Sequence, residues 1–333
     1  MIKKIFSTLW KLVLSATVLL FIASHFSTVI HDFSTRYVTH PVRGFYAALC
    51  NTLPIPFFEI GAVILVLAIP FLIWRYVGGF GRITPLLLSL EIILFGYLVT
   101  VGIDGAIPDK KDSVTVDEST YASTLESIVA ELNSIVPDLP ESIDFPESEI
   151  RALTASYAYS TLDRHFTHIP RVKTTIFDKM TKSLGVVAYY SPATAEVILR
   201  RSLPIHLEIS ASMHELMHFV GITEEDVAIY HSVAAMMKSK NEYIRYSALL
   251  EAYTRIAAEV YEQNADRYIE ISRKLLPRVT KDIASRRDVN VKSELGDKLN
   301  DVAITLHDGR GERSYKESAS LLVTLFENIR TVE

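Results

Sequence analysis

His214-Glu215-Leu216-Met217-His218 has the His-Glu-x-x-His spacing of the zinc hydrolases. On a helix, two histidines four residues apart lie on the same face, so both rings can bind one metal ion. Glu215 leans toward the same ion, where it can take a proton from a metal-bound water without being a ligand. The motif therefore predicts two zinc ligands, His214 and His218, and a general base, Glu215.

A third ligand is expected soon after the motif. Gly221 is typical of a residue that ends a helix, and a second helical pattern begins directly after it with acidic residues. Glu225 is followed one turn later by Ala228, whose small side chain lets the second helix approach the first. Glu224 is the competitor, because it lies six residues after His218. We favour Glu225 as the third ligand and keep Glu224 as the alternative.

The composition of the chain is typical of a membrane protein rather than a soluble enzyme. Of its 333 residues, 49% are hydrophobic and 22% are charged, and the mean hydropathy is +0.22. The formal net charge of −5 gives no reason to expect binding to nucleic acid. Cys50 is the single cysteine, which excludes a disulfide within the chain and a cysteine-rich zinc site.

Three apolar runs near the N-terminus each have about the twenty residues that are needed to cross a bilayer. They cover residues 5–24, 57–74 and 83–101. We therefore predict three transmembrane helices in a membrane region at 1–102, a polar linker at 103–117 and a catalytic domain at 118–333. Glu91 in the third run has two interpretations: a hydrogen bond between helices, which we favour, or part of a transport path.

Basic residues predict the orientation of these spans. Lys3, Lys4 and Lys11 lie at the amino side of the first run, and Arg75 and Arg82 bracket the loop between the second and third runs. Lysine and arginine accumulate on the cytoplasmic side of membrane proteins. We expect a multi-pass protein of the cell membrane, with a cytoplasmic N-terminus and an extracytoplasmic catalytic domain.

The pattern after residue 118 is mostly helical, with one pair of strands. Residues 186–190 and 195–199 are strand-like, and Ser191-Pro192-Ala193-Thr194 joins them. The predicted fold class is therefore α+β and mostly helical, with a small β-hairpin or sheet just before the metal helix. A strand at the edge of a cleft can bind an extended peptide, and an ordinary core hairpin explains the pattern equally well.

Several motifs spread over most of the chain carry a family resemblance. They are Lys173-Thr174 near Gly185, Tyr190-Ser191-Pro192 with Glu196, the zinc motif at 214–218, Gly221, Glu225-Asp226, Arg245-Tyr246-Ser247 and Ser314-Tyr315. With these residues the chain resembles the bacterial family DUF3810, which is grouped with the zincin-like metallopeptidases. The resemblance implies a zincin domain behind three membrane spans. It also marks Tyr246 and Arg245 as candidate hydrogen-bond donors to the oxyanion of the reaction.

One stretch departs from the family pattern. The family's acidic segment looks like Glu-Asp-Glu-Ala-Asn, whereas this chain has Glu225-Asp226-Val227-Ala228-Ile229, with apolar residues at two polar positions. Glu225 itself is retained, and the resemblance to other membrane zincins with Glu-x-x-Ala supports it as the ligand.

The sequence supports two functions. The first is a membrane-anchored metallopeptidase that binds Zn²⁺ and hydrolyses peptides or proteins at the cell envelope, which the intact Glu215 favours. The second is a catalytically silent zincin-fold scaffold or sensor in the membrane, which Val227 and Ile229 favour. A peptide substrate and the lipid bilayer are the expected partners, no nucleic acid is expected, and no oligomeric state is predicted.

Overall fold

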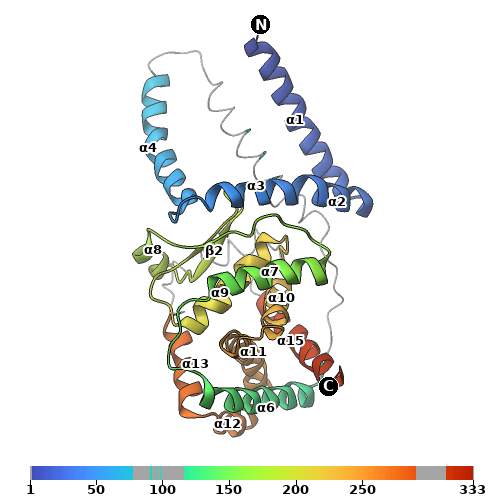
Figure 1. Cartoon of the computed structure of the whole chain (residues 1–333), viewed down its shortest axis with the longest axis vertical. Helices are drawn as coiled ribbons and strands as arrows, with labels where there is room; N and C mark the ends of the chain where they lie inside the picture. The colour runs from blue at the N-terminus through green and yellow to red at the C-terminus, as the bar shows by residue number, and fades with distance from the viewer. Residues whose placement is uncertain are drawn as a thin grey trace.

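The structure is a computed structural model, and it describes residues 2–77, 91, 95, 98, 116–289 and 313–332. At one end of the molecule, two long helices rise from shorter helices that lie across the body (Figure 1). The rising helices are α1 (Ile2–Ser24) and α4 (Phe57–Val77). The elements that lie across the body are α2 (Thr28–Ser34), the π-helix η1 (Thr35–Thr39) and α3 (His40–Cys50).

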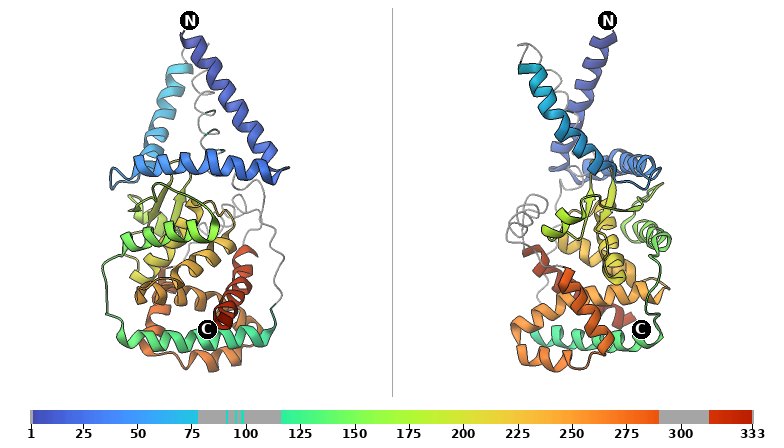
Figure 2. Two further views of the ribbon diagram at one scale, coloured as in Figure 1. Left: turned by 45° about the vertical axis from the view of Figure 1, so that its right-hand side comes forward. Right: turned by 90° about the vertical axis from the view of Figure 1, so that its left-hand side faces the viewer.

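The body has a small sheet next to these N-terminal helices and a larger group of helices beyond it (Figure 2). Before the sheet and within it, the elements are α6 (Glu118–Ile135), the 3-10 helix η4 (Val136–Asp138), α7 (Glu147–Leu162), β1 (Val172–Thr174), α8 (Asp178–Ser183), β2 (Ala188–Ser191) and β3 (Glu196–Leu199). After the sheet come α9 (Ile205–Phe219), α10 (Glu225–Met237), α11 (Glu242–Gln263), α12 (Ala265–Ser272), α13 (Pro277–Val289) and α15 (Arg313–Val332).

Helix α11 lies at the centre of the helical group, where it packs against α6, α9, α10 and α15. Asn241 begins the helix, because its side chain accepts a hydrogen bond from the Tyr243 backbone N–H at 3.0 Å. Buried residues then recur every three or four positions, at Tyr243, Tyr246, Ser247, Leu250, Tyr253, Ala257 and Val260. This spacing places one wide face of α11 in the core, where it packs against α9.

Within the described residues the sheet has the strand order β1-β3-β2, with β1 parallel and β2 antiparallel to the central strand. All four residues of β3 are buried, because this strand has a neighbour on both sides. Strands β2 and β3 confirm the predicted hairpin, and Tyr190 lies opposite Val197. Strand β1 was not predicted. It has only three residues, so its pattern is too short to stand out in the sequence.

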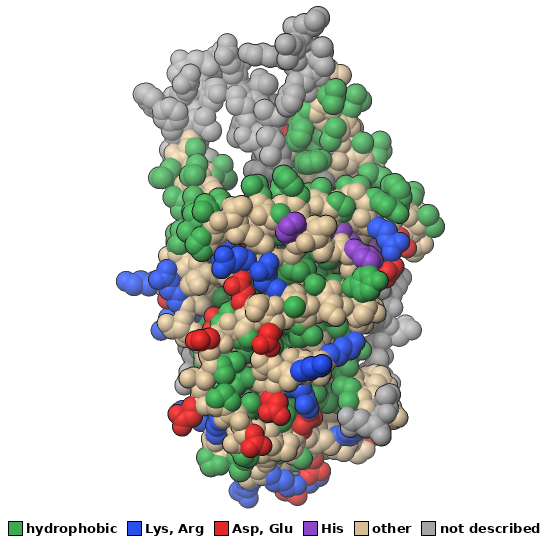
Figure 3. Space-filling model, viewed as in Figure 1, with side chains coloured by type: hydrophobic (Ala, Val, Ile, Leu, Met, Phe, Trp, Pro, Cys, Tyr) green, Lys and Arg blue, Asp and Glu red, His purple; other side chains and the backbone are tan. Residues whose placement is uncertain are grey.

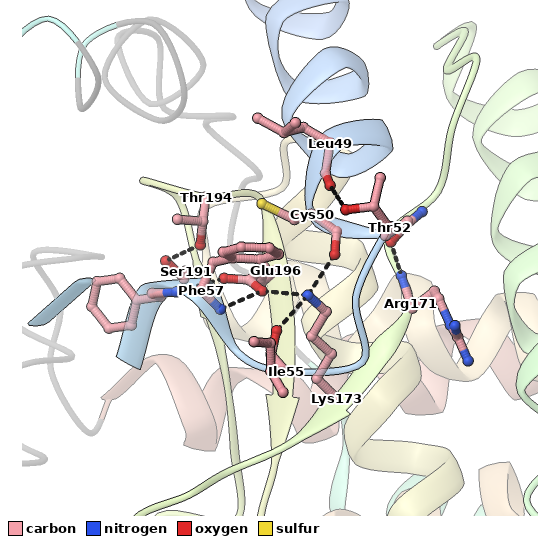
Figure 4. A network of polar contacts seen from close by, with 12 residues as sticks. Leu49, Cys50, Thr52, Ile55, Phe57, Arg171, Lys173, Ser191, Thr194 and Glu196 are labelled. Carbon is pink, nitrogen blue, oxygen red and sulfur yellow. Dashed lines mark hydrogen bonds and ion pairs between the residues drawn. The ribbon is translucent and has the colours of Figure 1, made fainter. Parts of the chain in front are cut away.

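A buried ion pair joins the N-terminal helices to the sheet (Figure 4). Lys173 Nζ of β1 lies 2.6 Å from Glu196 Oε1 of β3, and the side chains are 2% and 1% exposed. The ammonium group also donates to the carbonyl oxygens of Cys50 and Ile55, between α3 and α4. Glu196 in turn accepts hydrogen bonds from the first two backbone N–H groups of α4. Both buried charges are therefore paired and hydrogen-bonded, as burial requires.

The prediction of three transmembrane helices is wrong for the described part of the chain. No helix there is both long enough and apolar enough to cross a membrane. Charged residues interrupt both apolar runs that lie there. Lys11 is inside α1, and Glu59 in the first turn of α4 is buried against the sheet, where it accepts from the Tyr189 hydroxyl at 2.5 Å. The third run, 83–101, lies outside the described residues except for 91, 95 and 98.

The described surface separates apolar from charged side chains. Figure 3 shows apolar side chains gathered over the N-terminal helices and charged side chains over the body. Glu91 accepts a hydrogen bond from Trp10 Nε1 at 2.9 Å, which agrees with the favoured interpretation of this carboxyl group. The predicted linker lies outside the described residues except for its last two. The predicted domain limits and the location at a cell membrane stay predictions.

Candidate metal centre

The zinc motif lies on α9, which packs against β2, β3, α7, α10 and α11. Apolar residues surround the two histidines along the helix, and their side chains are buried. They are Leu207, Ile209, Met213, Leu216 and Met217. The predicted helix and its predicted end are both present. The motif is thus held on a rigid element in the core rather than on a loop.

Gly221 ends α9 in the way that the sequence predicts. Its φ of 99° is in the left-handed region that favours glycine. The Ile222 N–H donates to the Met217 carbonyl and the Gly221 N–H donates to the His218 carbonyl, both at 3.0 Å. These two bonds form a Schellman motif, which satisfies the last carbonyl groups of the helix. The turn also brings the Ile222 carbonyl back toward the motif.

Three predicted ligands meet at one point. His214 Nε2 lies 3.1 Å from Glu225 Oε2 and 3.1 Å from His218 Nε2, and His218 Nε2 lies 3.5 Å from Glu225 Oε1. Ligand atoms that surround one zinc ion tetrahedrally at about 2.0–2.1 Å are about 3.3–3.4 Å from each other. The two histidine nitrogens have this spacing, and each lies at a similar distance from a different oxygen of Glu225. Three protein ligands of this kind leave a fourth position for water or substrate at a catalytic zinc site.

The orientation of His218 is fixed by the turn that follows the helix. Its Nδ1 lies 2.7 Å from the Ile222 carbonyl oxygen, which can only accept. Nδ1 therefore carries a proton, and Nε2 is directed at the other two residues of the cluster. Ligating histidines commonly donate their second N–H to a carbonyl or carboxylate, which orients the ring and makes it a better ligand.

The charge distribution at this point favours a cation. Burial alone would lower the pKa of His218, but the neighbouring Glu225 carboxylate raises it to about 9. Burial alone would raise the pKa of Glu225, but His218 and His214 hold it well below its ordinary range. Glu225 therefore stays ionised at neutral pH, and its charge is balanced by a positive charge between the rings, which a proton or a metal ion can supply.

Glu215 lies beside the ligands and is 8% exposed. Burial raises the pKa of its carboxyl group, and the nearby histidines partly oppose this effect. The backbone N–H of Tyr190, on β2, donates a hydrogen bond to it. Glu215 is not among the three residues whose ligand atoms lie within 4.8 Å of one another, as expected for a base that does not bind the metal itself.

The other predicted site residues lie elsewhere. Glu224 is the residue before the first turn of α10 and is outside the ligand cluster. The Tyr246 hydroxyl donates to Asp282 Oδ2 of α13 at 2.7 Å, and Arg245 forms an ion pair with Glu131 of α6 at 2.9 Å. Both oxyanion candidates are therefore bound to other partners in this structure, and their role stays a prediction.

Two arginines hold the end of α9 and were not identified from the sequence. Arg43 Nη1, on α3, donates to the Phe219 carbonyl at 3.1 Å, and Arg164 Nη1, after α7, donates to the Val220 carbonyl at 2.6 Å. Arg43 is only 1% exposed. The helix dipole places partial negative charge at these carbonyls, which favours cations there. No local pattern signals such contacts, because both arginines are distant from α9 in the sequence.

A family model described as "Protein of unknown function (DUF3810)" matches residues 35–323. The match begins at η1 and ends within α15, so it includes the cluster of His214, His218 and Glu225 and the helices that carry these residues. It confirms the family resemblance seen in the sequence. No curated protein and no solved structure matches the chain.

Proposed function

We propose a zinc-dependent peptidase activity for this chain, which belongs to the DUF3810 family. The observation that carries the proposal is the convergence of His214, His218 and Glu225, whose ligand atoms all lie within 4.8 Å of one another, with Glu215 beside them. Two imidazoles, one carboxylate and an open position form a donor set typical of catalytic rather than structural zinc sites.

In this proposal, Glu215 and His218 have different roles in the reaction. Bound zinc would polarise a substrate carbonyl and lower the pKa of a water. Glu215 takes the proton of that water and returns it to the leaving amine. Its burial raises its pKa toward neutrality, which suits a group that must accept a proton and then release it. His218 is kept in the correct tautomer by the Ile222 carbonyl.

The position of β2 at one edge of the described sheet supports a peptide as the substrate. The Arg200 N–H donates to the Val187 carbonyl at 2.9 Å, so this pair is hydrogen-bonded and the pattern alternates along the two strands. The backbone groups of Ala188 and Tyr190 therefore point away from β3. Because the Tyr190 N–H reaches Glu215, an extended peptide that pairs with this edge would place its backbone beside the general base.

The apolar positions that separate this chain from its family weaken the case for a silent scaffold. Val227 and Ile229 are 3% and 1% exposed and belong to the hydrophobic core. Glu225 is the residue that α10 contributes to the cluster with His214 and His218. The apolar residues at 227 and 229 therefore remove no group from that cluster.

Zinc content and peptide cleavage by the purified full-length chain test the proposal. Glu215→Gln removes the base and leaves the ligands, and Glu208→Gln on the same helix is the matched control. We expect the parent and both variants to bind one zinc ion, and Glu215→Gln alone to lose cleavage of a peptide library by about a thousandfold or more. A parent that binds no zinc overturns the metal centre. A parent that binds zinc and cleaves nothing is the silent scaffold.

A further inference from the structure

A buried charged cluster lies behind the metal helix, and the mechanism above does not use it. Arg286 of α13 is 4% exposed, forms an ion pair with Glu251 of α11, and donates to Ser210 Oγ of α9 at 3.3 Å. Arg255 Nε, one turn after Glu251, donates to Glu251 Oε1 at 3.0 Å. The Glu251 carboxylate, on a side chain that is 14% exposed, is thus held by two guanidinium groups, one of them buried, and loss of a partner there would be unfavourable.

This carboxylate lies close to the first zinc ligand. Ser210, which shares Arg286 with Glu251, is one helical turn before His214 and therefore on the same face of α9. Helices α9 and α11 pack directly against each other. Burial alone would raise the pKa of Glu251, but Arg286 and Arg255 lower it to about 2, and His214 acts in the same direction. Glu251 is therefore ionised and interacts electrostatically with His214.

His214 needs a hydrogen-bond acceptor for its second ring nitrogen, Nδ1, if it is to bind a metal through Nε2. A ligating histidine commonly donates its second ring N–H to an acceptor, as His218 does to Ile222. The contacts of His214 within the described residues are all made by Nε2. The α10 position one turn after Glu225 is Ile229, which is buried and has no acceptor in its side chain. Among the elements that pack against α9, helix α11 carries the carboxylate of Glu251, which can serve as this acceptor.

We propose that Glu251 is a positioning residue for His214, with its carboxylate receiving the Nδ1–H through one bridging water and so keeping Nε2 turned toward the metal. Arg286 and Arg255 fix the carboxylate for this role. The inference rests on the proposed zinc centre and adds a residue to it that lies on a third helix. It also gives a reason for the two charges buried between α11 and α13.

The difficulty in a test is that loss of Glu251 alone leaves Arg286 buried without its partner, which destabilises the fold. The double variant Glu251→Leu/Arg286→Met removes both charges and keeps the volume. Glu131→Leu/Arg245→Met removes an ion pair between α6 and α11 with the same change of charge and is the control, although its side chains are more exposed, at 32% and 35%. Zinc affinity is measured by competition with a chelator, the cobalt-substituted protein by its visible absorption, and the fold by thermal unfolding, all on the full chain.

The expected result is that the double variant unfolds near the temperature of the control pair but binds zinc roughly 10–100-fold more weakly, with shifted cobalt bands. The control pair keeps the affinity and the spectrum of the parent. If the Glu251/Arg286 variant binds zinc as tightly as the parent, or loses affinity only in step with its melting temperature, the positioning role is wrong and the zinc centre stands. If the parent itself binds no zinc, both proposals fall.

Discussion

Gly221 connects the backbone of α9 to the orientation of His218, a proposed metal ligand. Its left-handed conformation allows the Schellman turn, and that turn delivers the Ile222 carbonyl to His218 Nδ1 at 2.7 Å. A side chain at this residue therefore affects two properties at once, the stability of the helix end and the direction of the ring.

We predict that Gly221→Ala lowers the free energy of unfolding by about 1 kcal/mol or more and also weakens zinc binding, because a Cβ disfavours the φ of 99°. Chemical unfolding and chelator competition measure the two effects. The control is Gly61→Ala on α4, where an added Cβ would meet nothing within 4 Å. That change should be neutral or slightly stabilising. Unchanged zinc affinity in Gly221→Ala would show that the Ile222 carbonyl does not orient His218.

The choice between the two acids can also be tested residue by residue. Glu225→Gln should lower zinc affinity about 100-fold or more, because it removes the only anionic ligand of the cluster, whereas Glu224→Gln should change it little. Zinc stoichiometry after dialysis separates the two variants, which have the same change of charge. The opposite pattern would transfer the ligand role to Glu224.

At the scale of the elements, α9 depends on groups that it does not contain. Its last carbonyls are bound by Arg43 from α3 and Arg164 from the segment after α7. Its first half is linked to α13 through Ser210 and Arg286. Helix α9 is therefore held at its C-terminal end by Arg43 and Arg164, and in its first half by Arg286, all from distant parts of the chain.

Loss of Arg43 should loosen the end of the helix that carries His218. We expect Arg43→Met to lower the free energy of unfolding by about 1.5–3 kcal/mol, since a buried charged hydrogen bond to a carbonyl is lost. Zinc affinity should fall with it. Arg278→Met is the control, because Arg278 also donates to backbone carbonyls, at Leu139 and Pro140, away from α9. Equal losses of zinc affinity in both variants would mean that Arg43 acts on general stability alone.

The elements show where the sequence was sufficient and where it was not. The metal helix, its end at Gly221 and the β2–β3 hairpin depend on periodicity and turn residues within short segments, and all three could be predicted. Arg43, Glu251 and Arg286 gave no signal, because their partners are brought to them only by the folded chain. Tyr246 stood in a marked motif, but its hydroxyl is bound by Asp282.

The error about the membrane helices has a related physical cause. An apolar run in the sequence does not show which of its residues contact the rest of the protein. Glu59 and the first N–H groups of α4 are bound by the sheet, so the start of the second run is part of the protein interior.

At the scale of the whole molecule, the N-terminal helices and the body meet at the buried pair Lys173–Glu196. We predict that Glu196→Gln destabilises the chain by about 3–5 kcal/mol, because Lys173 is left without a counter-charge in the core. The double variant Lys173→Met/Glu196→Gln should recover part of this loss. Urea unfolding of the three chains gives the comparison. A single variant as stable as the parent would show that water reaches the ammonium group.

The short separation of the metal ligands along the chain has a kinetic consequence. His214, His218 and Glu225 are joined by one helix end and one tight turn, whereas Arg43 and Glu251 must arrive from far away. Closing so small a loop costs little conformational entropy and is fast compared with the meeting of remote segments. At the proposed zinc site, we therefore expect zinc that is present during refolding to be captured by a local α9–α10 hairpin, which would then act as a nucleus for the later helices.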